Sequence, residues 1–134
     1  MRPIPIIFGL VLLVYLGAGS GAGAAETNHS KQLYAQYCSS CHGVDGRGNG
    51  PVARDLKVKV PNLILLRKNN KGIYPTDRVM SAIDGRRAIR GHGDRNMPVW
   101  GEIFRKEADD AKYPELTTLL KAKLIAEYIA TLQQ

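Results

Sequence analysis

The sequence has 134 residues, a formal net charge of +7 at pH 7 and 44% hydrophobic residues. This length fits a single domain, and the hydrophobic content is ordinary for a globular protein. The positive charge favours acidic partners. Because the basic residues are scattered rather than gathered in an arginine-rich run with interleaved aromatics, we expect no nucleic-acid partner.

The N-terminus has the layout of a secretory signal peptide. Arg2 gives a positive start, Ile4 to Leu16 is mostly apolar, and Gly17 to Ala25 contains only small residues. The strongly apolar part is shorter than the ~20 residues of a membrane-spanning helix. We therefore expect residues 1–25 to be removed and residues 26–134 to form one domain. The alternative is a membrane anchor formed by residues 4–24.

The first element expected after the signal peptide is a helix. Residues 27–30 are good N-cap residues, and the residues that follow at helical spacing are Leu33, Tyr34, Tyr37, Cys38 and Cys41. This pattern predicts a helix over residues 29–40 whose apolar face also carries the cysteines.

Both cysteines of the chain lie in the segment Cys38-Ser39-Ser40-Cys41-His42, which is the attachment pattern of a c-type haem. Two thiols three residues apart, and the residue after the second, point to one side of a helical turn. We expect Cys38 and Cys41 to form thioethers with the haem vinyl groups and His42 Nε2 to bind the iron.

Three other interpretations of this segment are open. A thioredoxin-type Cys-x-x-Cys pair is disfavoured because no βαβ pattern surrounds the segment. A structural zinc site is disfavoured because there is no second cysteine pair. A structural disulfide is compatible with an exported protein, but it leaves His42 unexplained.

The segment after the motif is rich in glycine. Gly46, Gly48 and Gly50 stand at alternate positions, and we expect them to let the backbone run close to the haem edge. Further along, Leu56, Val58 and Val60 alternate with lysines. This alternation predicts a short strand, with an irregular loop under the haem as the alternative.

Thr76 is expected to cap a second helix over residues 77–84, in which Val79, Met80 and Ile83 share one face. We expect Met80 to pack in the core rather than to bind a metal. Residues 91–101 have no helical or strand period and are expected to form a loop. Met97 lies in this polar loop, which suggests a role for its sulfur atom.

The last third of the chain contains the most regular pattern. Residues 102–113 are expected to form an exposed connection, and a long amphipathic helix is expected to start at Pro114. Its broad apolar stripe, which we expect the fold to use fully, consists of Leu116, Leu119, Leu120, Leu124, Ile125, Tyr128, Ile129 and Leu132.

The haem-attachment pentad, the Met-Pro loop downstream and the closing helix together resemble class I cytochrome c, in particular bacterial mono-haem members. The resemblance covers nearly all of the mature chain. It implies an all-α, cytochrome c-like fold, with three to five short helices around one covalent haem c held through Cys38 and Cys41.

The same resemblance implies roles for individual residues. Met97 would be the second axial ligand, and the carbonyl oxygen of Pro61 would accept a hydrogen bond from His42 Nδ1. Trp100, in the run that follows Met97, would contact the cofactor. His92 is the rival axial ligand.

The resemblance also concerns the crossing of the first and last helices. Tyr34 and Tyr128 stand where the family places an aromatic pair at this crossing. Ser30 stands where many members have glycine. The distance between the two helices at their crossing therefore does not follow from the resemblance.

We therefore expect a periplasmic one-electron carrier that is not an enzyme. Its partners would be redox proteins with acidic docking faces, including transient contacts with membrane oxidoreductases, near an exposed haem edge at residues 43–48 flanked by Arg47 and Arg54. The alternatives are a haem subunit of a larger periplasmic dehydrogenase or oxidase, and a small haem peroxidase or gas sensor.

Overall fold

The computed structural model describes residues 21–85 and 99–134, and all the regular structure in these residues is helical. The expected all-α fold is thus confirmed. The α-helices are α1 (Gly21–Tyr37), α2 (Ser39–His42), α3 (Thr76–Asp84), α4 (Trp100–Glu107) and α5 (Pro114–Thr131), and three short 3-10 turns are η1 (Ala53–Asp55), η2 (Leu63–Leu65) and η3 (Lys68–Asn70).

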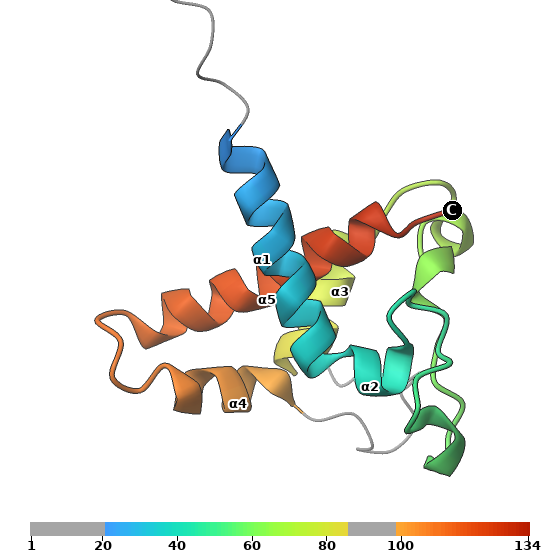
Figure 1. The fold of residues 1–134 in the computed structure, drawn as a ribbon, viewed down its shortest axis with the longest axis horizontal. Helices are drawn as coiled ribbons and strands as arrows, with labels where there is room; N and C mark the ends of the chain where they lie inside the picture. The colour runs from blue at the N-terminus through green and yellow to red at the C-terminus, as the bar shows by residue number, and fades with distance from the viewer. Residues whose placement is uncertain (1–20, 86–98) are drawn as a thin grey trace, which may run out of the picture.

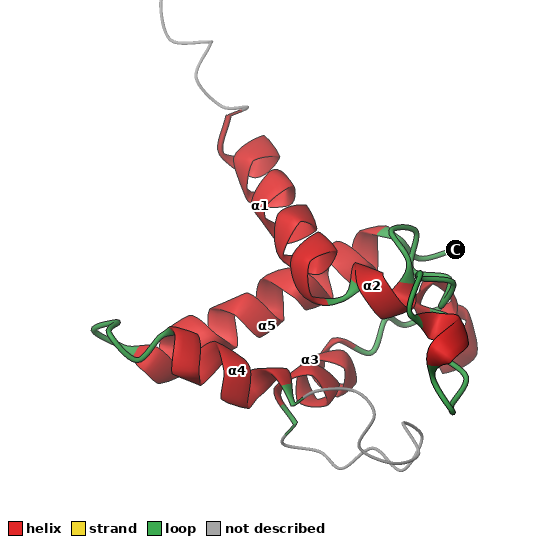
Figure 2. Ribbon diagram, turned by 60° about the horizontal axis from the view of Figure 1, so that its bottom comes forward, coloured by secondary structure: helices red, strands yellow, loops and turns green. Residues whose placement is uncertain are grey.

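The core forms where α1 crosses α5 (Figures 1 and 2). The ring centroids of Tyr34 and Tyr128 lie 5.1 Å apart at this crossing, with an interplanar angle of 47°. The expected aromatic pair is therefore confirmed. Ser30 on α1 is only 5% exposed, and its hydroxyl donates a hydrogen bond to the carbonyl oxygen of Thr27. A serine is accommodated here because its polar group is satisfied within its own helix.

The first helix differs from the prediction at both ends. It begins at Gly21 rather than residue 29, and it ends at Tyr37, where Cys38 has φ −120° and ψ −33°. Residues 39–42 then form the separate turn α2. The predicted helix over 29–40 is thus interrupted at Cys38, so the two cysteines lie on either side of a break in the helix.

The short strand predicted over residues 56–60 is wrong. These residues form bends and extended backbone without strand pairing, although Val60 is buried and Lys57 and Lys59 are exposed. A strand needs a neighbouring strand to satisfy its backbone groups, and the described part of the chain supplies none. Alternating burial here reflects a loop that lies on the core.

The helix predicted over residues 77–84 is confirmed as α3, but the cap predicted at Thr76 is wrong: Thr76 is the first helical residue, and the N-cap is Pro75, without a side-chain cap hydrogen bond. Its Val79 and Ile83 are buried, and Met80 packs at the edge of the same core, as expected. The exposed connection predicted over residues 102–113 is wrong in its first half, which belongs to α4. Phe104 is 0% exposed because α4 lies against α5, as Figure 2 shows.

Helix α5 follows the prediction in extent but not in burial. Its inner face is buried at Ala122, Ile125, Ala126 and Ile129, but Leu116, Leu119 and Leu120 are 52%, 41% and 47% exposed. The expectation that the fold uses the whole apolar stripe is therefore wrong for the first two turns of the helix. Among the described residues, no helix has the length and apolar character needed to cross a membrane.

Candidate functional site

Helix α2 gathers three of the residues singled out in the sequence. Cys38 is 6% exposed, His42 is 7% exposed and Cys41 is partly buried between them. The backbone nitrogens of Cys41 and His42 both donate to the carbonyl oxygen of Cys38, at 3.3 and 2.9 Å. This single hydrogen-bonded turn fixes the backbone of the segment that carries the two thiols and the imidazole.

The orientation of His42 is set by a carbonyl group from another part of the chain. His42 Nδ1 lies 3.3 Å from the carbonyl oxygen of Pro61, in agreement with the role that the resemblance implies for Pro61. In the tautomer that carries its hydrogen on Nδ1, the ring donates to Pro61 and leaves the Nε2 lone pair for a metal ion.

Gly48 brings the Pro61 segment close to His42. Its backbone nitrogen donates to the carbonyl oxygen of His42 at 2.8 Å, and its φ of +77° favours glycine. A Cβ atom at this position would lie only 2.5 Å from the carbonyl oxygen of Val60. The glycine is therefore needed for close approach of two protein backbones, a role that the glycine pattern alone did not specify.

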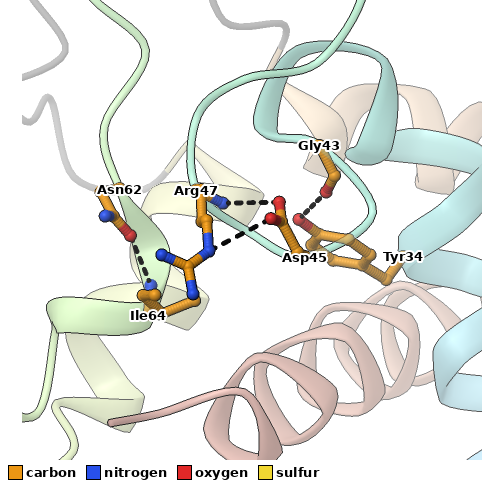
Figure 3. A network of polar contacts seen from close by, with 6 residues as sticks. All are labelled: Tyr34, Gly43, Asp45, Arg47, Asn62 and Ile64. Atoms are coloured by element: carbon orange, nitrogen blue, oxygen red, sulfur yellow. Dashed lines mark hydrogen bonds and ion pairs between the residues drawn. The ribbon is translucent and has the colours of Figure 1, made fainter.

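Figure 3 shows the polar contacts that hold the loop after His42. The buried hydroxyl of Tyr34 donates to the carbonyl oxygen of Gly43 at 2.7 Å. Asp45 accepts from the backbone nitrogen of Arg47 at 3.2 Å, and its other oxygen lies 3.2 Å from Arg47 Nε. The loop is thus attached to α1 at its start and braced by an ion pair at its tip.

Burial controls the ionisation of two groups beside this loop. Desolvation raises the pKa of the Cys38 thiol to about 12, and the nearby Cys41 acts in the same direction. Desolvation is also the main cause of the raised pKa of Tyr34, with smaller contributions from Cys38, Tyr128 and Asp45. Both groups are neutral near pH 7, as their low exposure requires.

These properties separate the interpretations of the cysteine motif. Burial raises the pKa of the Cys38 thiol, so Cys38 lacks the lowered pKa of a reactive redox cysteine. Cys38 and Cys41 are both free thiols, which is not the arrangement of a structural disulfide. Residues 21–85 and 99–134 contain no cluster of three or more histidine, cysteine or acidic side chains suited to hold a metal ion, so a closed zinc site is not formed there. Two thiols and an oriented imidazole fit covalent attachment and axial ligation of haem.

Trp100 lies beside the attachment segment, although it is far from it in the sequence. Its ring packs edge-on against Tyr37, with centroids 5.2 Å apart, and stacks against Phe104 at 6.0 Å. Tyr37 directly precedes Cys38 and donates a hydrogen bond to Glu107 Oε2 at 2.8 Å. The last residue of α1 and the helix α4 are therefore joined next to Cys38.

Met97 and His92 lie outside the described residues, so their roles as axial ligands stay predictions. The residues that flank this segment are closely packed. A Cβ atom at Gly85 would lie 2.3 Å from Val99 Cγ1, and one at Gly101 would lie 2.3 Å from the carbonyl oxygen of Asp84. These glycines allow the end of α3 and the start of α4 to meet, a requirement that was not recognised in the sequence.

The all-helical structure of the described residues is consistent with a c-type cytochrome domain. A family model described as "Cytochrome C oxidase, cbb3-type, subunit III" matches residues 25–113. The match covers more than half of the chain, so the chain belongs to this family of c-type cytochrome domains, whose members carry covalent haem c and transfer electrons. No curated protein and no solved structure matches the chain.

Proposed function

We propose that the protein is a periplasmic one-electron carrier with a single haem c attached through Cys38 and Cys41 and bound axially by His42 and Met97. The observation that carries this proposal is the buried His42 ring, whose Nδ1 lies 3.3 Å from the Pro61 carbonyl oxygen. Haem with histidine and methionine ligands supplies an iron couple of raised reduction potential.

The protein residues have three tasks in this proposal. Cys38 and Cys41 hold the cofactor covalently, so that it stays in place in both oxidation states. Pro61 keeps the Nε2 atom of His42 directed at the iron and increases the basicity of the ring. Two strong ligands leave the iron without an open position, which is why we propose a carrier rather than an enzyme.

The surface beside the attachment segment supports a transient docking face. Val44 is 77% exposed two residues after the motif, and Arg47, Arg54 and Lys59 in the segment that follows are exposed as well. An apolar centre with a basic rim suits brief contact with acidic redox partners, including membrane oxidoreductases. The layout of residues 1–25 as an export signal supports a periplasmic location.

Absorption spectra of the oxidised holoprotein test the axial ligands. We expect a weak band near the red end of the visible spectrum in the wild type, because a thioether binds the iron. The band should be absent in Met97→Ala and retained in His92→Ala, which serves as the matched control. Its persistence in Met97→Ala would assign the second ligand to another residue.

Mass spectrometry of the denatured protein tests the attachment. After expression with haem-attachment machinery, the chain should carry the mass of one haem, and the double variant Cys38→Ala/Cys41→Ala should carry none. A wild-type chain with the mass of its amino acids alone would contradict the proposal.

A second candidate function is that of a permanent haem subunit in a larger periplasmic dehydrogenase or oxidase. The description of the matching family as an oxidase subunit favours it. Size-exclusion chromatography of the native protein distinguishes the two. Co-elution with a much larger oxidoreductase would support the subunit, whereas elution at the size of a small cytochrome would support the free carrier.

A further inference from the structure

The first two turns of α5, together with Tyr113 just before the helix, present large apolar side chains to solvent. Tyr113, Leu116, Leu119 and Leu120 are 58%, 52%, 41% and 47% exposed. We call these four residues the leucine face. Scattered exposed apolar residues are ordinary, but a contiguous group on one side of a helix is typical of an interaction surface.

The leucine face points away from the protein's own core. At the same level of α5, Thr118 and Ala122 are 7% and 0% exposed and form the inward side. With 3.6 residues per turn, Leu116 and Leu120 lie on the opposite side of the helix from these two. Figures 1 and 2 show this half of α5 extending beyond its crossing with α1, beside α4.

Charged residues flank the leucine face in a self-complementary way. Glu115 lies four residues before Leu119, and the exposed Lys123 lies four residues after it. In an antiparallel pairing of two identical helices centred on Leu119, Glu115 of one copy comes opposite Lys123 of the other, and this happens twice. Lys123 also pairs with Glu127 of its own helix, which leaves its remaining ammonium hydrogens available.

We propose that the leucine face binds a second copy of this chain, forming a two-fold symmetric, antiparallel α5–α5 dimer. Symmetric pairing lets one patch serve as both surfaces of the interface. A different protein would have to supply its own matching apolar surface and charges, whereas this chain already carries both.

The proposed dimer is weak. A stable interface buries ~800 Å² per partner, and four side chains that are each about half exposed supply only part of this area. The interface is also compatible with electron transfer. Leu132, the C-cap of α5, lies next to Gly46 of the attachment loop, and the 13 residue steps from Leu119 to Leu132 span ~20 Å of helix. The docking face near residue 44 thus stays open in the dimer.

Sedimentation equilibrium of the holoprotein over a range of concentrations up to ~1 mM tests the dimer. We expect reversible dimerisation in the wild type. Leu119→Glu should weaken it at least tenfold, whereas Ile73→Glu, at a position that is 70% exposed and outside the leucine face, should leave it unchanged. Far-ultraviolet circular dichroism and the haem absorption spectrum verify that each variant is folded.

Charge reversal tests the antiparallel register. Glu115→Lys alone places two lysines opposite each other, and Lys123→Glu alone places two glutamates opposite each other. Each variant should dimerise about tenfold more weakly than the wild type, and an equimolar mixture of the two should recover the lost affinity, because every pair is then of opposite charge.

A protein that is monomeric at ~1 mM would overturn the proposal. So would a dimer that Leu119→Glu leaves intact, or a mixture of the two charge variants that associates no more tightly than either alone. None of these results depends on the identity of the axial ligands, so the dimer and the proposed electron carrier are tested separately.

Discussion

The two halves of α5 have similar apolar content but opposite environments. In the C-terminal half, Ile125 and Ala126 are 0% exposed and Ile129 is 3% exposed, because α1 crosses the helix there. In the N-terminal half, Leu116, Leu119 and Leu120 are about half exposed. The difference shows that an apolar stripe predicts a helix but does not tell which of its turns the rest of the chain covers.

Replacing a large side chain by alanine should lower the free energy of unfolding far more in the C-terminal half of α5 than in the N-terminal half, and this is the largest effect that we expect. Ile125→Ala should lower the free energy of unfolding by about 2–5 kcal/mol, because it leaves a cavity in the core. Leu120→Ala should cost less than about 1 kcal/mol, because the side chain is half solvated already. Guanidinium titration at low micromolar concentration, where the monomer dominates, measures both. Equal losses would mean that the two halves are equally buried.

Tyr74, just before α3, is attached to the C-terminal half of α5 by a hydrogen bond. Its hydroxyl donates to the carbonyl oxygen of Ala126 at 2.7 Å, and burial raises the pKa of Tyr74 above its ordinary value. The unfolded chain therefore ionises this tyrosine at lower pH than the folded protein does. The contribution of Tyr74 to stability should be independent of pH below pH ~10 and should decrease as the pH rises further.

The variant Tyr74→Phe isolates that contribution. At pH 7 it should lose about 1 kcal/mol, the net value of a hydrogen bond. Between about pH 10 and pH 11, its stability should fall less steeply than that of the wild type, by less than about 1 kcal/mol. Unfolding midpoints measured across this range provide the check, and identical slopes for the two proteins would refute the assignment.

The smallest expected effect concerns the contact that attaches α4 to the N-terminal half of α5. Lys121 Nζ lies 2.7 Å from Glu107 Oε2, and the Glu107 side chain is 39% exposed. The hydrogen bond from Lys121 is the main cause of the lowered pKa of Glu107, and the hydrogen bond from Tyr37 adds to it. The stabilisation is thus present above pH ~4.3 and is lost as the pH falls through the folded-state pKa.

Glu107→Gln should accordingly lower stability at pH 7 by less than about 1 kcal/mol, because solvent screens this pair. At a pH well below the lowered folded-state pKa of Glu107, the charge-dependent part of this difference between the variant and the wild type should disappear. Thermal melts at the two pH values make the comparison. A loss that is as large at low pH as at neutral pH would show that packing, not charge, is responsible.

Several features of the fold were predictable from sequence because they are local. The extent of α3 followed from apolar spacing, and the start of α5 followed from Pro114. Helix α4 was missed because Glu107, Asp109 and Asp110 make residues 102–113 look like a solvated connection, although Trp100 and Phe104 stand four residues apart on one face. The false strand at residues 56–60 arose because alternation alone does not require a pairing partner.

The candidate site, like the fold, was predictable from the sequence only in part. The positions of Cys38, Cys41 and His42 followed from spacing, and the contact between His42 and Pro61 followed from the family resemblance. The roles of Gly48, Gly85 and Gly101 did not follow from either, because each depends on a backbone segment that is distant in sequence. The assignments of Met97 and His92 lie outside the described residues and are left to the spectroscopic test.

The sequence by itself determined the class of chemistry expected of this protein, because the spacing of Cys38, Cys41 and His42 is a local pattern that predicts a haem-attachment segment, and the match over residues 25–113 is to a c-type cytochrome domain. Only the tertiary structure decided which carbonyl group orients the imidazole, which glycines permit close approach, and which leucines are left in solvent. Those properties depend on contacts between segments far apart in the chain, and their geometry arises only when the helices pack.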